Sequence, residues 1–167
     1  GPSKHFKTAF SLLMARSYLD KYPDAALLFY DSEFGTPQSY FDSFGIDTKR
    51  VLHTPITNLE QLKFDAMQQI DNLERGDRVM IVIDSITSLL PAIYFEKDSN
   101  ELKQLENTKQ IGAESRDFSN AWKMLNYANN KVNPTLLVLI SQSRNNISAM
   151  YTSQQPTGGQ ATKFYSS

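Results

Sequence analysis

The sequence predicts an α/β fold in which helices cover both faces of a mostly parallel sheet. Two observations support this prediction: short apolar runs such as Val79–Ile83 and Thr135–Ile140, and helical patterns that alternate with them. Strands that are apolar on both faces are typical of parallel sheets held between two helix layers. The chain has 167 residues, of which 40% are hydrophobic, and this is enough for one domain with its own core.

The first half of the chain alternates helix and strand. A helix is predicted over Lys7–Lys21. Its apolar side is formed by residues at helical spacing: Phe10, Leu13, Met14 and Tyr18. Pro23-Asp24 ends this helix, and the apolar run Ala25–Tyr30 suits a buried strand. A short helix over Gln38–Phe44 and a second, shorter strand over Val51–Thr54 follow.

The next helix has the clearest signals. Asn58 is a suitable N-cap for a helix that runs to Glu74. One side of that helix is apolar: Leu59, Leu62, Ala66, Ile70 and Leu73. Val79–Ile83 is the strongest strand signal, because it is apolar throughout and rich in β-branched residues. A further helix is predicted over Ser115–Asn130, before the strand Thr135–Ile140, with Trp122 in the core.

Two long segments fit no helix or strand. Residues 91–112 are polar and charged, and residues 143–160 are rich in Ser, Asn, Gln, Thr and Gly. Loops of this length are uncommon in a compact domain and are usually functional or disordered. We therefore expect these two segments to carry a function.

Composition excludes several classes of protein. The uninterrupted apolar runs, such as Leu136–Ile140, are far shorter than the ~20 residues of a membrane-spanning helix. No signal segment opens the sequence. The absence of cysteine excludes disulfides, thiolate zinc sites and a cysteine nucleophile. This composition fits a reducing compartment, and we expect a cytoplasmic protein.

The net charge of −1 hides an asymmetry. Residues 1–102 carry 10 Lys or Arg and 15 Asp or Glu, whereas residues 103–167 carry 7 and 3. Charge that differs between halves suggests that they do different jobs. A chance distribution is an equally good interpretation of the charge alone.

A phosphate-binding loop is predicted at the start of the chain. Gly1-Pro2-Ser3-Lys4-His5-Phe6-Lys7-Thr8 follows the pattern G-x-x-x-x-G-K-[ST], except that Phe6 replaces the second glycine. In this interpretation Lys7 reaches the β- and γ-phosphates and the hydroxyl of Thr8 binds Mg²⁺. The alternative is a surface turn that carries Lys and Thr by chance.

Polar residues that follow the predicted strands support the phosphate site. Asp84 ends Val79–Ile83 and could help to hold Mg²⁺, although such a residue is also a common helix N-cap. Glu33 lies just past Ala25–Tyr30 and is a candidate to orient the attacking water. The carboxyl ends of parallel strands face one crevice, so four side chains are expected to converge there: Asp31, Glu33, Asp84 and Gln142.

Taken in order, these residues resemble the ATPase core of RecA-type strand-exchange recombinases, in particular the UvsX-like recombinases of T-even-like phages. The resemblance rests on five motifs that cover nearly the whole chain: Gly1–Thr8, Phe29–Phe34, Val82–Pro91, Leu137–Arg144 and Thr157–Ser167. The phage branch also carries Phe before the phosphate-loop lysine, so Phe6 becomes a mark of that subfamily. The resemblance implies a RecA-like P-loop ATPase core over residues 1–167, truncated at both ends.

The resemblance implies ATP and Mg²⁺ as cofactors. It assigns nucleotide contacts to Gly1, Pro2, Ser3, Lys4, His5, Phe6, Lys7, Thr8, Tyr40, Asp84 and Lys163, with Thr8 and Asp84 at the metal. Glu33 would orient the attacking water, Gln142 would sense the γ-phosphate, and Lys163 would reach a neighbouring subunit's nucleotide. Tyr40 would stack on adenine; an aromatic on the core side of a short helix is the alternative.

The resemblance also implies DNA as a partner. It identifies residues 91–112 and 143–160 as two DNA-binding loops and assigns DNA contacts to Arg116, Lys123, Arg144, Tyr151, Gly158 and Gly159. For each basic residue, a solvated surface charge is the alternative. Basic groups along a backbone path suit binding of single strands without sequence preference.

The function implied is that of an ATP-dependent DNA recombinase. Such an enzyme forms a helical filament on single-stranded DNA, pairs it with homologous duplex DNA and exchanges strands in recombination and repair. The host cytoplasm is the expected compartment if a phage encodes the chain, and the fragment alone need not be active. The alternatives are a DNA motor on the same fold, either a helicase or a RadA-like branch-migration ATPase, and a non-hydrolysing, ATP-gated DNA-binding module.

Overall fold

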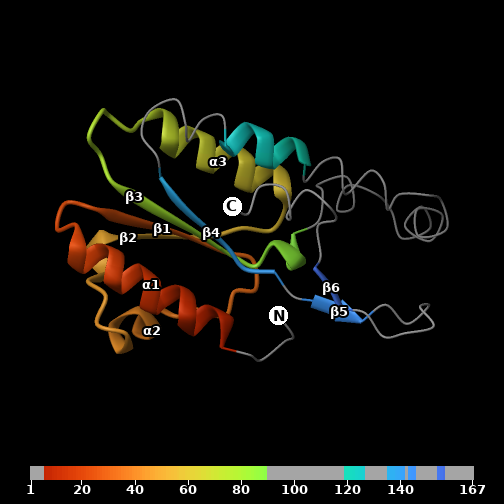
Figure 1. The fold of residues 1–167 in the computed structure, drawn as a ribbon, viewed down its shortest axis with the longest axis horizontal. Helices are drawn as coiled ribbons and strands as arrows, with labels where there is room; N and C mark the ends of the chain where they lie inside the picture. The colour runs from red at the N-terminus through yellow and green to blue at the C-terminus, as the bar shows by residue number, and fades with distance from the viewer. Residues whose placement is uncertain (1–5, 90–118, 127–134, 142, 146–153, 157–167) are drawn as a thin grey trace.

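A four-stranded, all-parallel sheet forms the centre of the molecule (Figure 1). The structure is a computed structural model that describes residues 6–89, 119–126, 135–141, 143–145 and 154–156. The strand order is β2-β1-β3-β4. The four strands are β1 (Ala26–Asp31), β2 (Val51–Pro55), β3 (Val79–Asp84) and β4 (Leu136–Leu139). The predicted fold class, an α/β domain with a parallel sheet, is confirmed.

Helices cover both faces of this sheet, as the apolar strands predict (Figure 1). Helices α1 (Lys7–Lys21) and α2 (Gln38–Ser43) lie on one face. Helix α3 (Leu59–Asp71) and the helical residues 119–126 lie on the other. No helix in the described part of the chain is long and apolar enough to cross a membrane.

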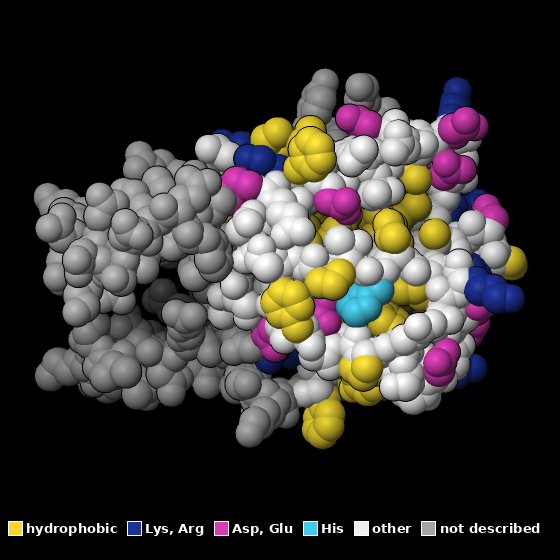
Figure 2. Space-filling view, turned by 180° about the vertical axis from the view of Figure 1, so that it is seen from behind, with side chains coloured by type: hydrophobic (Ala, Val, Ile, Leu, Met, Phe, Trp, Pro, Cys, Tyr) yellow, Lys and Arg dark blue, Asp and Glu magenta, His cyan; other side chains and the backbone are white. Residues whose placement is uncertain are grey.

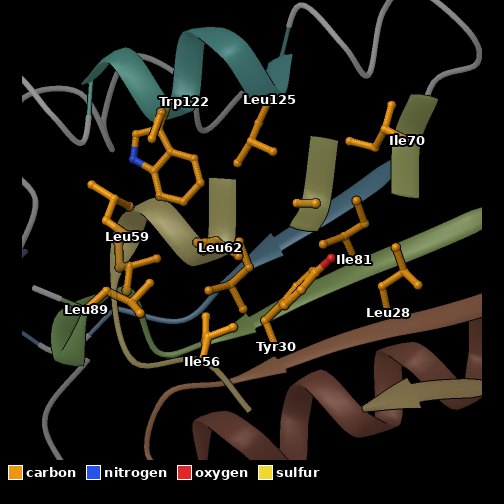
Figure 3. Packing of buried hydrophobic residues seen from close by; sticks show 14 of the residues in the cluster. Leu28, Tyr30, Ile56, Leu59, Leu62, Ile70, Ile81, Leu89, Trp122 and Leu125 are labelled. Atoms are coloured by element: carbon orange, nitrogen blue, oxygen red, sulfur yellow. The ribbon is translucent and has the colours of Figure 1, made fainter. Parts of the chain in front are cut away.

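Two hydrophobic clusters fill the layers, one on each side of the sheet. Successive strand residues point to opposite faces, so Tyr30 and Ile81 pack below α3 whereas Phe29 and Met80 pack against α1. Figure 3 shows Trp122 and Leu125 packing over the first cluster. The prediction that Trp122 belongs to the core is therefore confirmed.

Helix α3 follows its sequence signals closely. The side chain of Asn58 accepts a hydrogen bond from the backbone N of Gln61 at 2.8 Å, as an N-cap does. The predicted apolar side faces the core: Leu59, Leu62, Ala66 and Ile70 are buried and Leu73 packs against them. The helix ends at Asp71, three residues before the predicted Glu74. Of the helix predicted over residues 115–130, residues 119–126 are helical and the others lie outside the described part.

The predicted apolar side of α1 is wrong. Phe10, Leu13 and Met14 are exposed, while the residues that face the sheet are Ser11, Leu12, Ala15 and Leu19. Both sets recur at helical spacing, and packing against β1 and β3 decides between them. Only Tyr18 of the predicted set packs against the core.

On the face that Figure 2 shows, exposed hydrophobic side chains stand among acidic, basic and polar groups.

The predicted loop over residues 143–160 contains two short strands. Strand β5 (Ser143–Asn145) pairs antiparallel with β6 (Gln154–Pro156), so this part of the segment is a two-stranded ribbon. Short 3₁₀ turns, η1 (Thr48–Arg50) and η2 (Ile86–Ser88), precede β2 and follow β3. The predicted loop over residues 91–112 lies outside the described residues.

Candidate functional site

The candidate site lies where β1 and β3 end and α1 begins. Asp31 and Asp84 are register partners at the ends of these two neighbouring parallel strands. Glu33 follows β1 by two residues, and Thr8 stands in the first turn of α1. The carboxyl ends of strands in an open α/β sheet border the crevice where ligands bind. The structure therefore brings together the predicted site residues Thr8, Glu33 and Asp84, which come from α1, the turn after β1 and the end of β3.

A hydrogen bond ties the start of α1 to the end of β3. The hydroxyl of Thr8 donates to Asp84 Oδ2 at 2.5 Å, across 76 positions of sequence. Asp84 is buried, and burial is the main cause that raises the pKa of its carboxyl. The negative charges of Glu33 and Asp31 raise this pKa further, whereas the Thr8 hydrogen bond and the charge of Lys7 lower it. A cation at this position would relieve the repulsion among the three carboxylates.

Two serine hydroxyls hold Glu33. Ser85 Oγ donates to Glu33 Oε1 at 2.8 Å, and Ser88 Oγ donates to the same oxygen at 3.4 Å. Ser85 directly follows β3, so these contacts bring Glu33 to the strand that ends in Asp84. The sequence had suggested no role for either serine.

A reciprocal pair of hydrogen bonds joins the ends of β1 and β3. Ser32 Oγ donates to the carbonyl of Ser85 at 2.7 Å and accepts from the backbone N of Ser85 at 2.9 Å. The peptide bond between Asp84 and Ser85 is cis. The signal for this pair is the repeated Asp-Ser that ends both strands, because aligned parallel strands bring the two serines together.

Asp31 supports the site rather than facing it. Its Oδ1 accepts from the backbone N of Glu33 and its Oδ2 from the backbone N of Thr36, each at 3.0 Å. Nε2 of His53 lies 3.4 Å from Asp31 Oδ2. A buried aspartate that caps the next backbone N–H groups fixes the turn. Asp31 therefore holds the loop that carries Glu33, although the sequence had placed it among the ligand-facing groups.

Phe6 adopts the backbone conformation that a glycine would favour. Its φ is 54° and its ψ is 25°, in the left-handed region, and its side chain is 75% exposed. The chain thus enters α1 with the geometry that the second glycine of the phosphate-loop pattern favours. The first backbone N–H groups of α1 have no helical partners and can bind an anion. The other predicted loop residues, Gly1, Pro2, Ser3, Lys4 and His5, lie outside the described residues.

The donor set suits a nucleotide-bound Mg²⁺ better than a metal held by protein alone. Within the described ranges, no group of three or more His, Cys, Asp or Glu side chains could hold a metal. Thr8 and Asp84 instead offer two neighbouring oxygen atoms. Mg²⁺ usually takes one or two protein ligands and completes its shell with phosphate oxygens and water, and the residues present fit this pattern.

Tyr40 and Lys123 belong to two other elements, α2 and the helical residues 119–126. Tyr40 is half-buried on α2, where its ring packs against the second cluster and meets Phe44 edge to face at 5.2 Å. This packing supports the alternative of a core aromatic, and stacking on adenine stays a prediction. Lys123 is exposed on the helical residues 119–126, beside the buried Trp122.

The remaining predicted residues lie outside what the structure describes. Gln142, Arg116, Tyr151, Gly158, Gly159 and Lys163 belong to this group. Arg144 is in β5, where its backbone position pairs with that of Gln155. The roles of all these residues stay predictions.

Comparisons with known proteins agree with this geometry. The family model of the RecA N-terminal domain matches residues 1–167. The chain is 50% identical over 101 residues to the recombination and repair protein of Enterobacteria phage T4, covering 60% of this chain and 26% of that protein. It is 32% identical over 168 residues to the RecA protein of Mycoplasma mycoides, which covers the whole chain and 45% of that protein. The chain therefore spans less than half the length of these relatives.

Proposed function

Because the chain belongs to the RecA N-terminal domain family, we propose that it is the ATPase core of an ATP-dependent DNA recombinase. One observation carries this proposal: Thr8 and Glu33 both meet the end of β3, through Asp84 and Ser85. A P-loop ATPase needs groups that hold Mg²⁺ and a group that orients the attacking water. Thr8 and Asp84 would do the first, and Glu33 the second. The relatives named as RecA or as a recombination and repair protein support the same class.

The nucleotide would bind at the start of α1. Lys7 and the N–H groups of the first helical turn would contact the phosphates, together with residues 1–6. Thr8 and Asp84 would hold the Mg²⁺ that accompanies ATP. This cation would supply positive charge near the phosphate oxygens. Tyr40 would contact the adenine.

Hydrolysis would depend on Glu33. Its carboxylate would orient a water molecule toward the γ-phosphorus and take up the proton as the P–O bond to ADP breaks, giving ADP and inorganic phosphate. Lys7 would stabilise the charge that develops on the phosphoryl oxygens. Gln142, three residues after β4, would pass the state of the nucleotide to residues 143–160.

DNA would bind through residues 91–112 and 143–160. The surplus of basic residues over residues 103–167 supports this part of the proposal. Its named contacts are Arg116, Lys123, Arg144, Tyr151, Gly158 and Gly159. The chain would assemble into a helical filament on single-stranded DNA in the cytoplasm, with ATP between subunits and Lys163 at the neighbour's nucleotide, and would test homology by base pairing with a duplex.

The test uses the full-length protein with Mg²⁺ and ATP. We expect single-stranded DNA of any sequence to stimulate ATP hydrolysis, and strands to exchange between a circular single strand and a homologous linear duplex. Directional unwinding of a forked duplex without strand exchange would instead identify a DNA motor. DNA binding that requires ATP but proceeds without hydrolysis would identify an ATP-gated binding module.

A further inference from the structure

Glu33 is an exposed residue whose carboxylate nevertheless has a defined position. Its Oε1 accepts from Ser85 Oγ at 2.8 Å and from Ser88 Oγ at 3.4 Å. A free glutamate side chain samples many rotamers, and ordering it has an entropic cost. Two donors on one oxygen therefore restrict a side chain that would otherwise rotate in solvent.

Ser85 is a rigid donor. It is fully buried, and its backbone N and carbonyl are both hydrogen-bonded to Ser32 Oγ. Ser32 itself directly follows β1, and its backbone N donates to the carbonyl of Asp84 at 2.8 Å. Glu33 and Ser85 are therefore fixed to the same pair of strands, so the distance between them is set by the sheet.

Ser88 extends the same arrangement by one helical turn. It is the last residue of η2, and its backbone N donates to the carbonyl of Ser85 at 3.4 Å. The two hydroxyl oxygens lie 3.5 Å apart, within reach of each other and of Glu33. Unlike Ser85, Ser88 is exposed, so its side chain can be changed without disturbing the core.

We propose that Ser85 and Ser88 are positioning residues that hold the Glu33 carboxylate in the orientation needed to direct the attacking water. This inference rests on the proposed function, in which Glu33 acts on that water. Catalytic groups need support that locks their rotamers, and displacement by about 1 Å can lower a rate by roughly 10²-fold. Ser85 supplies the shorter and more rigid contact, and Ser88 the second.

The first experiment measures steady-state ATP hydrolysis by the full-length protein with Mg²⁺ and saturating single-stranded DNA. We expect Ser85→Ala to lower kcat by about tenfold or more and Ser88→Ala to lower it by a smaller factor, with the KM for ATP nearly unchanged. Ser88→Thr keeps the hydroxyl and should keep the rate. Ser17→Ala, an exposed serine in the middle of α1, is the matched control and should match the wild type.

The second experiment separates positioning from a general structural role. Single-turnover rates are compared for Ser85→Ala and Ser88→Ala in the wild-type and Glu33→Gln backgrounds. If the serines act through Glu33, neither serine variant lowers the residual rate of Glu33→Gln. An equal loss in both backgrounds, an unchanged kcat in both serine variants, or a faster turnover would overturn the inference.

The outcomes also distinguish a failure of the positioning role from a failure of the proposed function. If Ser85→Ala does not fold, Ser88→Ala and Ser88→Thr still decide the question, because Ser88 is exposed. Full activity in both serine variants, with hydrolysis still dependent on Glu33, removes only the positioning role. A wild-type protein without ATPase activity, or a fully active Glu33→Gln variant, overturns the proposed function and the inference with it.

Discussion

Thr8 in the first turn of α1 and Asp84 at the end of β3 are joined by a hydrogen bond from the threonine hydroxyl to Asp84 Oδ2. The bond fixes the helix that would receive the phosphates against the strand that supplies the buried carboxylate. Both partners are oxygen groups of the kind that Mg²⁺ prefers. Without a cation, the same arrangement leaves Asp84 buried beside two other carboxylates, and this has consequences that can be measured.

Replacing Asp84 by Asn should stabilise the nucleotide-free protein at neutral pH. The pKa of Asp84 is raised in the folded state, chiefly by burial, so the charged form is disfavoured on folding. The folded state then holds its proton to higher pH than the unfolded state does, and Asp84 destabilises the protein above its folded pKa. Thermal unfolding should show a higher Tm for Asp84→Asn at pH 7.

The pH dependence supplies the control for this prediction. Well below about pH 4, the usual pKa of an aspartate, Asp84 is protonated in both states and the Tm difference should disappear. The same variant should lose Mg²⁺-dependent ATP binding, measured by titration calorimetry. A Tm at pH 7 below that of the wild type would contradict the conclusion that the buried charge of Asp84 destabilises the folded state.

Phe6→Gly should stabilise the fold. Phe6 has a φ of 54°, and the left-handed region costs a non-glycine residue roughly 1–2 kcal/mol. Its side chain is 75% exposed, so little packing is lost. Since glycine is itself entropically costly by about 0.5–1 kcal/mol, we expect urea denaturation to show a net gain of up to about 1.5 kcal/mol in the free energy of unfolding. Phe10→Gly, in the body of the same helix, should instead destabilise it by about 1 kcal/mol.

Removing the Asp31 carboxylate should impair both stability and turnover. Asp31→Ala leaves the backbone N–H groups of Glu33 and Thr36 without their acceptor. Each unsatisfied buried donor costs roughly 1–3 kcal/mol, and the turn that carries Glu33 loses its support. Denaturation should show this loss, and kcat for ATP should fall. Asp31→Asn keeps one acceptor oxygen and should have an intermediate effect, and an alanine variant with wild-type stability would disprove this role.

Leu62→Ala should create a cavity beneath the helical residues 119–126. Leu62 is fully buried in the cluster that contains Trp122 (Figure 3). We expect a loss of about 2–5 kcal/mol in the free energy of unfolding, and the fluorescence of Trp122, the single tryptophan of the chain, should change. Phe64→Ala, on the exposed side of the same helix, should change stability by at most about 0.5 kcal/mol.

The strands β1 and β3 were predictable because their residues are apolar on both faces. That pattern also located Asp84 and Glu33, since the carboxyl ends of parallel strands meet at one edge. Helix α1 was different: Leu12, Ala15 and Leu19 share helical spacing with the exposed Phe10, Leu13 and Met14, and only contact with the sheet separates the two sets.

The hydrogen bonds within the site could not be predicted in the same way. A carboxylate after a strand can face a ligand or cap its own turn, and Asp31 does the second. The contact from Ser85 to Glu33 depends on the register between β1 and β3, which periodicity does not give. Tertiary geometry is needed for both.

The most direct measurement compares the full-length wild type with Glu33→Gln for ATP hydrolysis and for binding to single-stranded DNA. If Glu33 orients the attacking water, the variant loses hydrolysis with and without DNA, because glutamine cannot take up the proton. It should still bind DNA more tightly in the presence of ATP, since Lys7, Thr8 and Asp84 are intact. Hydrolysis at the wild-type rate in Glu33→Gln would contradict the proposed mechanism.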